Sequence, residues 1–266
     1  LELLAHRIVW SLLFLGLLSA YRRRGEAIRE ILGNPRRVGL HLVGSLLIGS
    51  NWLLYMWAVN HQRVLDASLG YFLNPLMNVL VGMLAFGERL NRLRGIALLL
   101  AAAAVGLSLV VNGNVPAVSL VLAASFCAYS VLQRFNRIGV VEALTVETLI
   151  LVLPALWYLV DAERSGTGTA SSLPLHTFTL LALSGVITST PLLLFNYGAR
   201  KIPLTTLGIL QYISPSLQLL LGWLVFSEPL PWWRGASFGL GITAIALYAV
   251  DIRSRQPAPE APDADE

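Results

Sequence analysis

Long apolar runs, almost free of charged residues, recur along nearly the whole 266-residue chain. Such runs limit the choice of fold, because a helix of about 20 apolar residues crosses the roughly 30 Å hydrocarbon core of a bilayer. Only 13% of the residues are charged, about half the share found in ordinary soluble proteins. Nine stretches are long enough, at residues 3–21, 38–60, 65–86, 93–112, 115–133, 143–161, 176–199, 204–226 and 232–250. The sequence therefore predicts an all-α integral membrane protein in a lipid bilayer.

The rest of the composition excludes several functional classes. The single cysteine, Cys127, cannot form an internal disulfide, and no cysteines and histidines have the spacing of a metal site. The chain has no Walker motif, so we expect neither direct ATP hydrolysis nor a bound cofactor. An integral-membrane enzyme would need a reactive set of side chains facing one cavity, and the predicted spans contain none. That enzyme and a non-transporting membrane scaffold are the alternatives to a transporter.

Connections rich in arginine and lysine alternate along the chain with connections that hold few of them. This alternation predicts the orientation of the chain. Fifteen of these residues lie in the connections 22–37, 89–94, 134–137 and 200–201 and at the start of the tail. Three others, Arg63, Arg164 and Arg234, flank the intervening connections. Positively charged segments stay on the cytoplasmic side, so we expect a cytoplasmic C-terminus. The basic charge thus reflects topology and attraction to anionic lipid, and no nucleic-acid partner is expected.

An internal repeat is found when residues 65–95 are laid over residues 205–235, at an offset of 140 positions. The chemically distinctive matches are Pro75 with Pro215, Gly82 with Gly222, Glu88 with Glu228, Arg94 with Arg234 and Gly95 with Gly235. The arginine count puts the connection at Glu88 on the cytoplasmic side and the connection at Glu228 outside. The two copies are therefore predicted to be inverted repeats, as in many secondary transporters.

The repeat predicts the domain organisation. Residues 1–112 form the first repeat, with four helices, and residues 115–250 form the second, with five. Residues 251–266 are rich in Pro, Ala, Asp and Glu and are expected to be a disordered cytoplasmic tail. The counterpart of the helix at 115–133 would lie ahead of residue 1. We therefore expect the intact protein to have two five-helix repeats, with the first helix absent from this sequence; a nine-helix protein with an external N-terminus is the alternative.

Three runs of residues carry a resemblance to a known family. They are Asn51–Asn60 (NWLLYMWAVN), Ala67–Leu76 (ASLGYFLNPL) and Gln211–Pro215 (QYISP), with Glu88 and Glu228 closing the two repeats. Over residues 1–250 the chain resembles the RarD-type permeases of the EamA group, in the drug/metabolite transporter superfamily. The resemblance implies a ten-helix fold of two inverted five-helix repeats in the bacterial inner membrane. It also implies a secondary transporter of small organic solutes, whether drugs or metabolites, amino-acid-like ones included.

Pro75 and Pro215 fall near the middle of predicted spans. Proline has no backbone N–H, so the carbonyl four residues earlier loses its helical partner. Broken helices at corresponding positions of two halves mark the midplane binding sites of transporters. We therefore predict helix breaks at both prolines beside a substrate site. The alternative is a packing kink whose free carbonyl is satisfied by a neighbouring side chain.

Polar and aromatic residues gather on the same helices and their neighbours. Tyr71, Asn74 and Asn78 share one helix face, because residues three and four apart lie above one another. The candidate substrate-binding residues are Asn51, Trp52, Tyr55, Tyr71, Asn74, Asn78, Asn196, Gln211 and Gln218. Amides and aromatic rings suit a neutral or zwitterionic solute better than a bare ion. Alternatively, amides bridge helices within a bundle.

Glu147 is an ionisable residue inside a predicted span and is therefore a functional candidate, as a proton carrier. Snorkelling to the interface is the alternative role, and facilitated exchange without protons stays open. We expect the four histidines, His6, His41, His61 and His176, to lie near helix ends at the interface.

Two further features concern packing. Glu88 and Arg94, and likewise Glu228 and Arg234, are expected to tie the connection between two helices. Small residues such as Gly235 let helix backbones approach closely. These residues would serve a homodimer face or packing within the chain.

Overall fold

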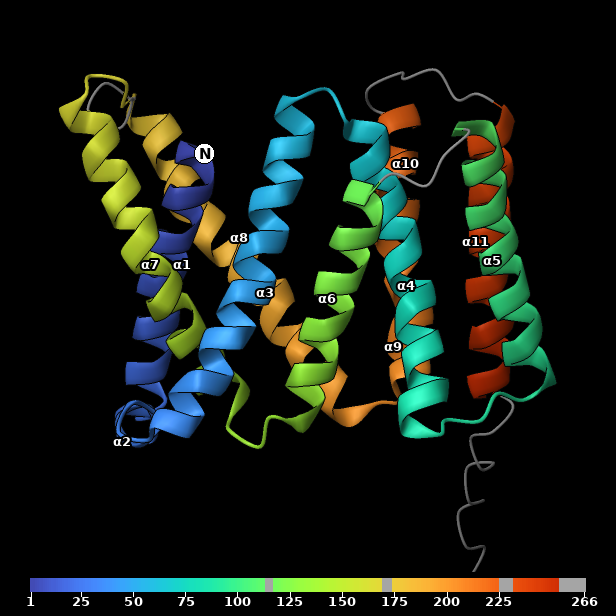
Figure 1. The fold of residues 1–266 in the computed structure, drawn as a ribbon, viewed down its shortest axis with the longest axis horizontal. Coiled ribbons are helices and arrows are strands. Elements are labelled where there is room, and N and C mark those ends of the chain that lie inside the picture. Colours follow the sequence, from blue (N-terminus) through green and yellow to red (C-terminus); the bar gives the residue numbers. More distant parts are fainter. Residues whose placement is uncertain (113–116, 169–173, 225–231, 254–266) are drawn as a thin grey trace, which may run out of the picture. The chain divides into compact units, whose positions relative to one another are not determined.

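The computed structural model describes residues 1–112, 117–168, 174–224 and 232–253, and every regular element in these ranges is a helix (Figure 1). Seven of the described helices are long and apolar enough to cross a membrane. The chain is thus an all-α, multi-pass membrane protein, as the sequence predicted. The helices are α1 (Glu2–Tyr21), α2 (Gly25–Leu32), α3 (Pro35–Asn60), α4 (Val64–Phe86), α5 (Arg92–Asn112), α6 (Ala117–Phe135), α7 (Val140–Arg164), α8 (Leu175–Lys201), α9 (Leu204–Gln211), α10 (Ile213–Leu224) and α11 (Trp232–Arg253). Residues 251–253, at the start of the predicted tail 251–266, belong to α11. The rest of that tail and the connection at Glu228 lie outside the described residues.

The connection 22–37 holds a helix that hydropathy did not reveal. This helix, α2, is only eight residues long, too short to span a bilayer. Ile28 and Ile31 lie three positions apart on one face, and Ile31 is buried against the rest of the protein, while α2 packs on α7. The arginines around these two isoleucines conceal the short apolar face in any average over a long window.

The predicted span 204–226 is divided in two. Helix α9 ends at Gln211 and α10 begins at Ile213, so Tyr212 lies between them. Pro215 is the third residue of α10, in the first turn, where a helix N–H has no acceptor within the helix. The helix α4, by contrast, runs unbroken past Pro75. The structure therefore interrupts the second of the two proline helices and leaves the first continuous, with Pro75 inside it.

The contacts of the chain divide it into two compact units. Unit 1 comprises Leu1–Gly70 and Pro116–Pro203. Within it, α1 packs on α7 and α8, and α3 packs on α6 and α7. The side-chain oxygens of Ser19, near the end of α1, and Thr145, near the start of α7, share a hydrogen bond of 3.0 Å. Leu4, near the start of α1, clusters with Val152 and Ala155, further along α7. The two helices therefore run antiparallel.

Unit 2 comprises Tyr71–Val115 and Leu204–Glu266, and α5 packs along α11 within it (Figure 1). Arg94, at the start of α5, donates from Nε to Asp251 Oδ2 at 2.7 Å, near the end of α11. Ser237, near the start of α11, donates to the carbonyl of Ala104 at 3.2 Å. These contacts show that α5 and α11 are antiparallel. Each unit draws residues from both predicted repeats, so the compact units and the repeats divide the chain differently.

The carboxylate of Glu88 caps α9, the helix that follows Pro203. Its two oxygens accept hydrogen bonds from the backbone N–H groups of Leu204 and Thr205, each at 2.8 Å. A negative charge at a helix N-terminus is stabilising because it satisfies free N–H groups and complements the helix dipole. The sequence predicts that Glu88 and Arg94 tie the connection between two helices. In the structure Arg94 binds Asp251, on α11, and Glu88 binds the start of α9, 116 residues further along the chain.

Gly185 lets the backbones of α8 and α1 touch. A Cβ atom at this position would lie 2.4 Å from the carbonyl carbon of Trp10 and 2.6 Å from the backbone nitrogen of Ser11. Backbone cannot move aside as a flexible side chain can. We therefore expect Gly185→Ala to lower the free energy of unfolding by about 1–3 kcal/mol, measured by thermal unfolding in detergent. Gly16→Ala is the control, because its added methyl group meets nothing within 4 Å; equal losses in both variants would contradict this packing.

Candidate functional site

Three of the predicted substrate-binding residues form a hydrogen-bonded amide cluster in unit 2. Asn78 Nδ2, on α4, donates to Gln211 Oε1, on α9, at 2.8 Å. Asn74 Nδ2 lies 3.5 Å from the same oxygen, and Asn78 Nδ2 lies 3.4 Å from Asn74 Oδ1. Asn78 is fully buried and Asn74 is 7% exposed. The structure thus brings together side chains that the sequence places 133 and 137 positions apart.

The backbone around the cluster explains why these amides meet. A Cβ atom at Gly208, on α9, would lie 2.6 Å from the carbonyl oxygen of Pro75, on α4. Only a glycine lets the two helices approach so closely. The break after Gln211 lies beside this contact: Tyr212 N–H bonds to the carbonyl of Ile209 at 3.2 Å, and its hydroxyl donates to the carbonyl of Phe72 at 3.1 Å. The interruption of the helix and the amide cluster therefore adjoin each other.

One polar atom of the cluster is left over. Asn78 Oδ1 is buried and has no hydrogen-bond partner within the described part of the chain. A buried acceptor without a donor costs roughly 1–3 kcal/mol, and such an atom in a native structure calls for an explanation. The three side chains are uncharged amides. They can therefore donate to and accept from a neutral polar group, but they offer no net charge to balance an ion.

The remaining predicted lining residues have other surroundings. Asn51 Nδ2 donates to the carbonyl of Leu122 at 2.8 Å and to Ser125 Oγ at 2.9 Å, so it bridges α3 and α6 within unit 1. This is the bridging role that the sequence left open for amides. The ring of Trp52 lies 5.8 Å from the guanidinium carbon of Arg7. Tyr55 packs against the buried cluster that contains Ala58.

Two more predicted residues lie in unit 2. Tyr71 has 38% of its surface exposed. The backbone of Gln218 belongs to α10, but its side chain lies outside the described residues.

A second polar cluster, in unit 1, surrounds Glu147. This carboxylate is 1% exposed and therefore does not snorkel to the surface. Tyr129 donates its hydroxyl to Glu147 Oε2 at 2.9 Å, and Gln133 Nε2 donates to Oε1 at 2.8 Å. His41 Nδ1 lies 3.3 Å from Oε1. Asn196, another predicted residue, donates from Nδ2 to the Tyr129 hydroxyl at 2.8 Å.

Sequence reasoning missed the partners of Glu147, among them His41. His41 lies near the start of its helix, as expected, but it is fully buried within the protein. Asn34 caps the start of α3, accepting from the N–H groups of Arg36 and Arg37, so the helix begins at Pro35 and His41 lies in its second turn. Tyr129 and Gln133 are four positions apart on α6 and share a face. That spacing is the signal by which they could have been found.

The Glu147 cluster extends to the end of α8. Arg200 Nη2 donates to Gln133 Oε1 at 2.9 Å, and Gln133 Nε2 in turn donates to Glu147 Oε1. Arg200 also donates to the carbonyl of Ile138. The arginine, the glutamine and the carboxylate thus form one chain of hydrogen bonds, which runs from a connection between helices to a fully buried acid.

A family model and a named relative identify the family, and a solved structure shares the fold. The model of the EamA-like transporter family matches residues 1–110 and 115–250. Protein RarD of Streptomyces exfoliatus is 42% identical over 250 residues, which cover 94% of this chain and 79% of the relative. An uncharacterized transporter of Vibrio cholerae is 41% identical over 254 residues, with 94% and 83% covered. A solved protein structure superposes with a TM-score of 0.68 over 96% of this chain and 89% of its own, at 20% identity.

Proposed function

The chain belongs to the EamA-like transporter family, and from this premise we propose that it is a secondary transporter that moves small organic solutes across the bacterial inner membrane by alternating access. Membership makes it a membrane transporter of the drug/metabolite superfamily. The names of its relatives describe transporters rather than enzymes. They favour this function over an integral-membrane enzyme or a non-transporting scaffold.

The amide cluster of Asn74, Asn78 and Gln211 is the substrate site in this proposal. The observation that carries it is Asn78 Oδ1, a buried acceptor with no partner among the described residues. A solute that donates a hydrogen bond would satisfy this oxygen. Because the cluster contains no charged side chain, the solute it fits is neutral or zwitterionic.

The packing of helices from equivalent positions of the two repeats supports alternating access by inverted repeats. At the offset of 140 positions, α1 corresponds to α7 and α5 corresponds to α11, and both pairs pack side by side. Both pairs are antiparallel, as the contacts of Ser19 with Thr145 and of Arg94 with Asp251 require. Within each unit, a two-fold axis that lies in the membrane plane and relates the two copies would produce such an antiparallel pair. The equivalent residues Phe72 and Tyr212 also touch, with ring centroids 6.3 Å apart, as expected close to such an axis.

Glu147 is the proton carrier in this proposal, and the C-terminus is cytoplasmic. A buried carboxylate inside a span is a functional candidate by default, and its contacts with His41, Tyr129 and Gln133 hold it in place. Facilitated exchange without protons is the alternative. The clustering of arginine and lysine on one set of connections supports the orientation.

Solute counterflow in proteoliposomes tests the transport proposal without any assumption about the driving force. Vesicles with purified protein would be preloaded with unlabelled solute and given the labelled form outside. The panel would contain zwitterionic amino acids, chloramphenicol as a neutral drug, lactate as an anion and choline as a cation. We expect exchange of zwitterionic or neutral members and none of lactate or choline. Exchange of the ions alone would contradict the amide cluster as the site, and exchange of no member, by a protein that unfolds cooperatively, would count against a transporter of this solute class.

A further inference from the structure

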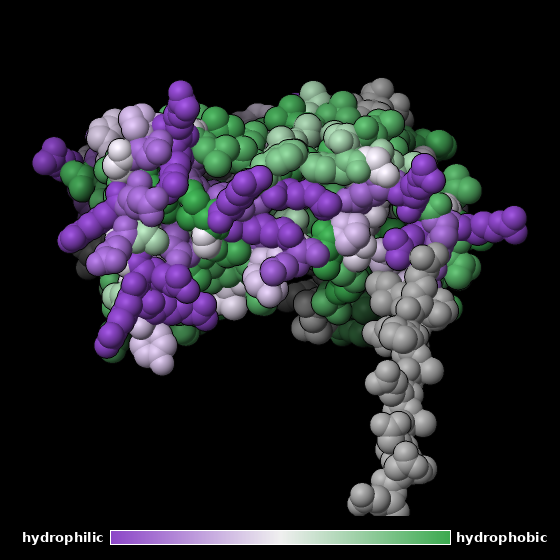
Figure 2. All heavy atoms as spheres, turned by 90° about the horizontal axis from the view of Figure 1, so that it is seen from below, coloured by the Kyte–Doolittle hydropathy of each residue, from purple (hydrophilic) through white to green (hydrophobic). Residues whose placement is uncertain are grey.

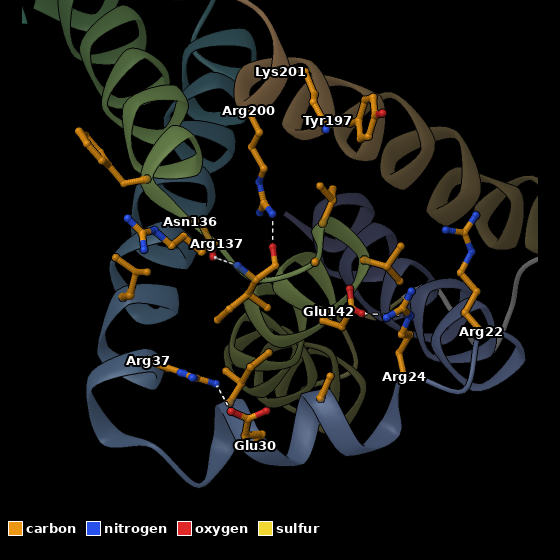
Figure 3. A pocket seen from close by; sticks show the side chains of 18 residues that line it. Arg22, Arg24, Glu30, Arg37, Asn136, Arg137, Glu142, Tyr197, Arg200 and Lys201 are labelled. Carbon is orange, nitrogen blue, oxygen red and sulfur yellow. Dashed lines mark hydrogen bonds and ion pairs between the residues drawn. The ribbon is translucent and has the colours of Figure 1, made fainter. Parts of the chain in front are cut away.

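A large basic pocket opens at one end of unit 1. It lies between the end of α1, α2, the start of α3, the connection from α6 to α7 and the end of α8, and its volume is about 1060 Å³ (Figure 3). Figure 2 looks at this end of the protein and shows hydrophilic side chains gathered there. None of the residues that line the pocket belongs to the amide cluster, so the pocket is a different site from the proposed substrate site.

Positive charge dominates the pocket lining. The cationic side chains are Arg22, Arg24, Arg37, Arg137, Arg200 and Lys201. Two carboxylates, Glu30 and Glu142, also line it. Each carboxylate already has a cation: Arg37 lies 2.6 Å from Glu30, and Arg24 lies 3.3 Å from Glu142. Three further cations, Arg22, Arg137 and Lys201, have no carboxylate partner among the described residues, while Arg200 forms no direct ion pair but lies in the field of Glu147 and Glu142.

One of these cations, Arg200, is only partly exposed to water. It reaches the buried Glu147 cluster through Gln133, and Figure 3 shows it directed into the pocket from α8. Its guanidinium donates to neutral acceptors, the side chain of Gln133 and the carbonyl of Ile138. Its Nε is buried and has no hydrogen-bond acceptor in the described part of the chain. A buried donor on a charged group is costly to leave without a partner.

We propose that this pocket binds a phosphate-type oxyanion, which is either the headgroup of an anionic lipid or free inorganic phosphate. Phosphate oxygens match the fixed donors of guanidinium groups in geometry and charge, and the pocket offers several such groups around one concave space. Basic pockets between helices on the cytoplasmic side of membrane proteins bind anionic headgroups in this way. Topology alone explains why arginines lie on this side, but it does not explain why they converge on one pocket.

Charge-matched variants test the site. The pocket variant carries Arg22→Gln, Arg137→Gln and Lys201→Gln, and the control variant carries Arg23→Gln, Arg29→Gln and Arg36→Gln. The control residues lie in the same basic connection but do not line the pocket. All six side chains are exposed, so both variants are expected to fold. The purified full chain in an uncharged detergent would be titrated with short-chain phosphatidylglycerol and, separately, with inorganic phosphate, and its unfolding temperature would be followed.

We expect the anion to raise the unfolding temperature of the unchanged protein. The pocket variant should bind on the order of a hundredfold more weakly, because each cation near an anionic lipid contributes roughly a factor of five. The control variant should keep its affinity within about threefold, since its charges lie outside the pocket. Stabilisation by phosphatidylglycerol alone would assign a lipid, and equal stabilisation by phosphate would assign the free ion. Equal weakening of both variants, or no stabilisation by either ligand, would overturn the proposal.

Discussion

Replacing Asn78 with leucine is expected to lower the rate of solute exchange about 5- to 150-fold, because a solute donor buried without its acceptor costs roughly 1–3 kcal/mol and each 1.4 kcal/mol is tenfold. The same variant should be about as stable as the unchanged protein. Leucine removes the buried oxygen that has no partner among the described residues, and this gain balances the lost hydrogen bonds to Gln211 and Asn74. Counterflow in proteoliposomes and thermal unfolding in detergent would measure the two effects.

The matched control is the same substitution at Asn51. Both hydrogen bonds of its Nδ2 go to α6, to Leu122 and Ser125, so Asn51→Leu should lower stability by about 1 kcal/mol with a smaller effect on exchange. A purely structural amide at Asn78 would behave in the same way. If Asn78→Leu is destabilised and its folded fraction still exchanges solute at the normal rate, the amide cluster is not the substrate site.

Replacing Glu147 with glutamine is expected to abolish the response of solute accumulation to a pH gradient. With one proton per solute, each pH unit supports about a tenfold concentration ratio across the membrane, since both correspond to about 1.4 kcal/mol. Glutamine has the same shape but cannot take up and release a proton. Its amide can keep the contacts of the cluster if Asn196 turns its side chain, whose buried Oδ1 has no partner in the described ranges, towards the Tyr129 hydroxyl. Accumulation at varied internal pH would be compared with counterflow, which should continue.

Removing the whole side chain of Glu147 provides the contrast to the glutamine variant. Glu147→Ala leaves Tyr129 and Gln133 without the acceptor of their hydrogen bonds, and we expect a loss of stability of about 2–6 kcal/mol, from roughly 1–3 kcal/mol for each buried donor. A purely structural carboxylate would show this loss, but its glutamine variant would still respond to the pH gradient. Such a persistent response would remove Glu147 from the coupling mechanism and leave facilitated exchange as the mode of transport.

Much of the fold could be predicted from the sequence, because the thickness of the bilayer sets the length of each span. Helices such as α1 and α3 therefore begin and end within a few residues of the apolar runs. The missed features depend on other signals. The helix α2 is shorter than a span, and its apolar face becomes recognisable only against α7. The position of the break at Tyr212, three residues before Pro215, depends on local hydrogen bonds that hydropathy does not report.

The site was predictable where helical spacing or the repeat register placed residues together. Asn74 and Asn78 follow from spacing along one helix, and Gln211 from its place beside the second proline. Glu147 could be recognised as an ionisable residue inside a predicted span, but its burial could not, and its contact with His41 joins residues 106 positions apart. Nothing near either residue in the sequence indicates that pairing. In the same way, a sequence shows that Arg200 is positive but not that it lies in a pocket with other cations.

The interleaving of the chain in its compact units has a consequence for biogenesis. Unit 1 needs both Leu1–Gly70 and Pro116–Pro203, and unit 2 needs both Tyr71–Val115 and Leu204–Glu266. The ribosome therefore releases α1 and α3 into the lipid long before their packing partners α6, α7 and α8 have been translated. During that interval the buried imidazole of His41 has no carboxylate beside it, because Glu147 has not yet been synthesised. The early and the late segment of each unit must therefore find each other in the membrane. The early and the late part of the chain should thus also assemble when a cell makes them as two separate polypeptides.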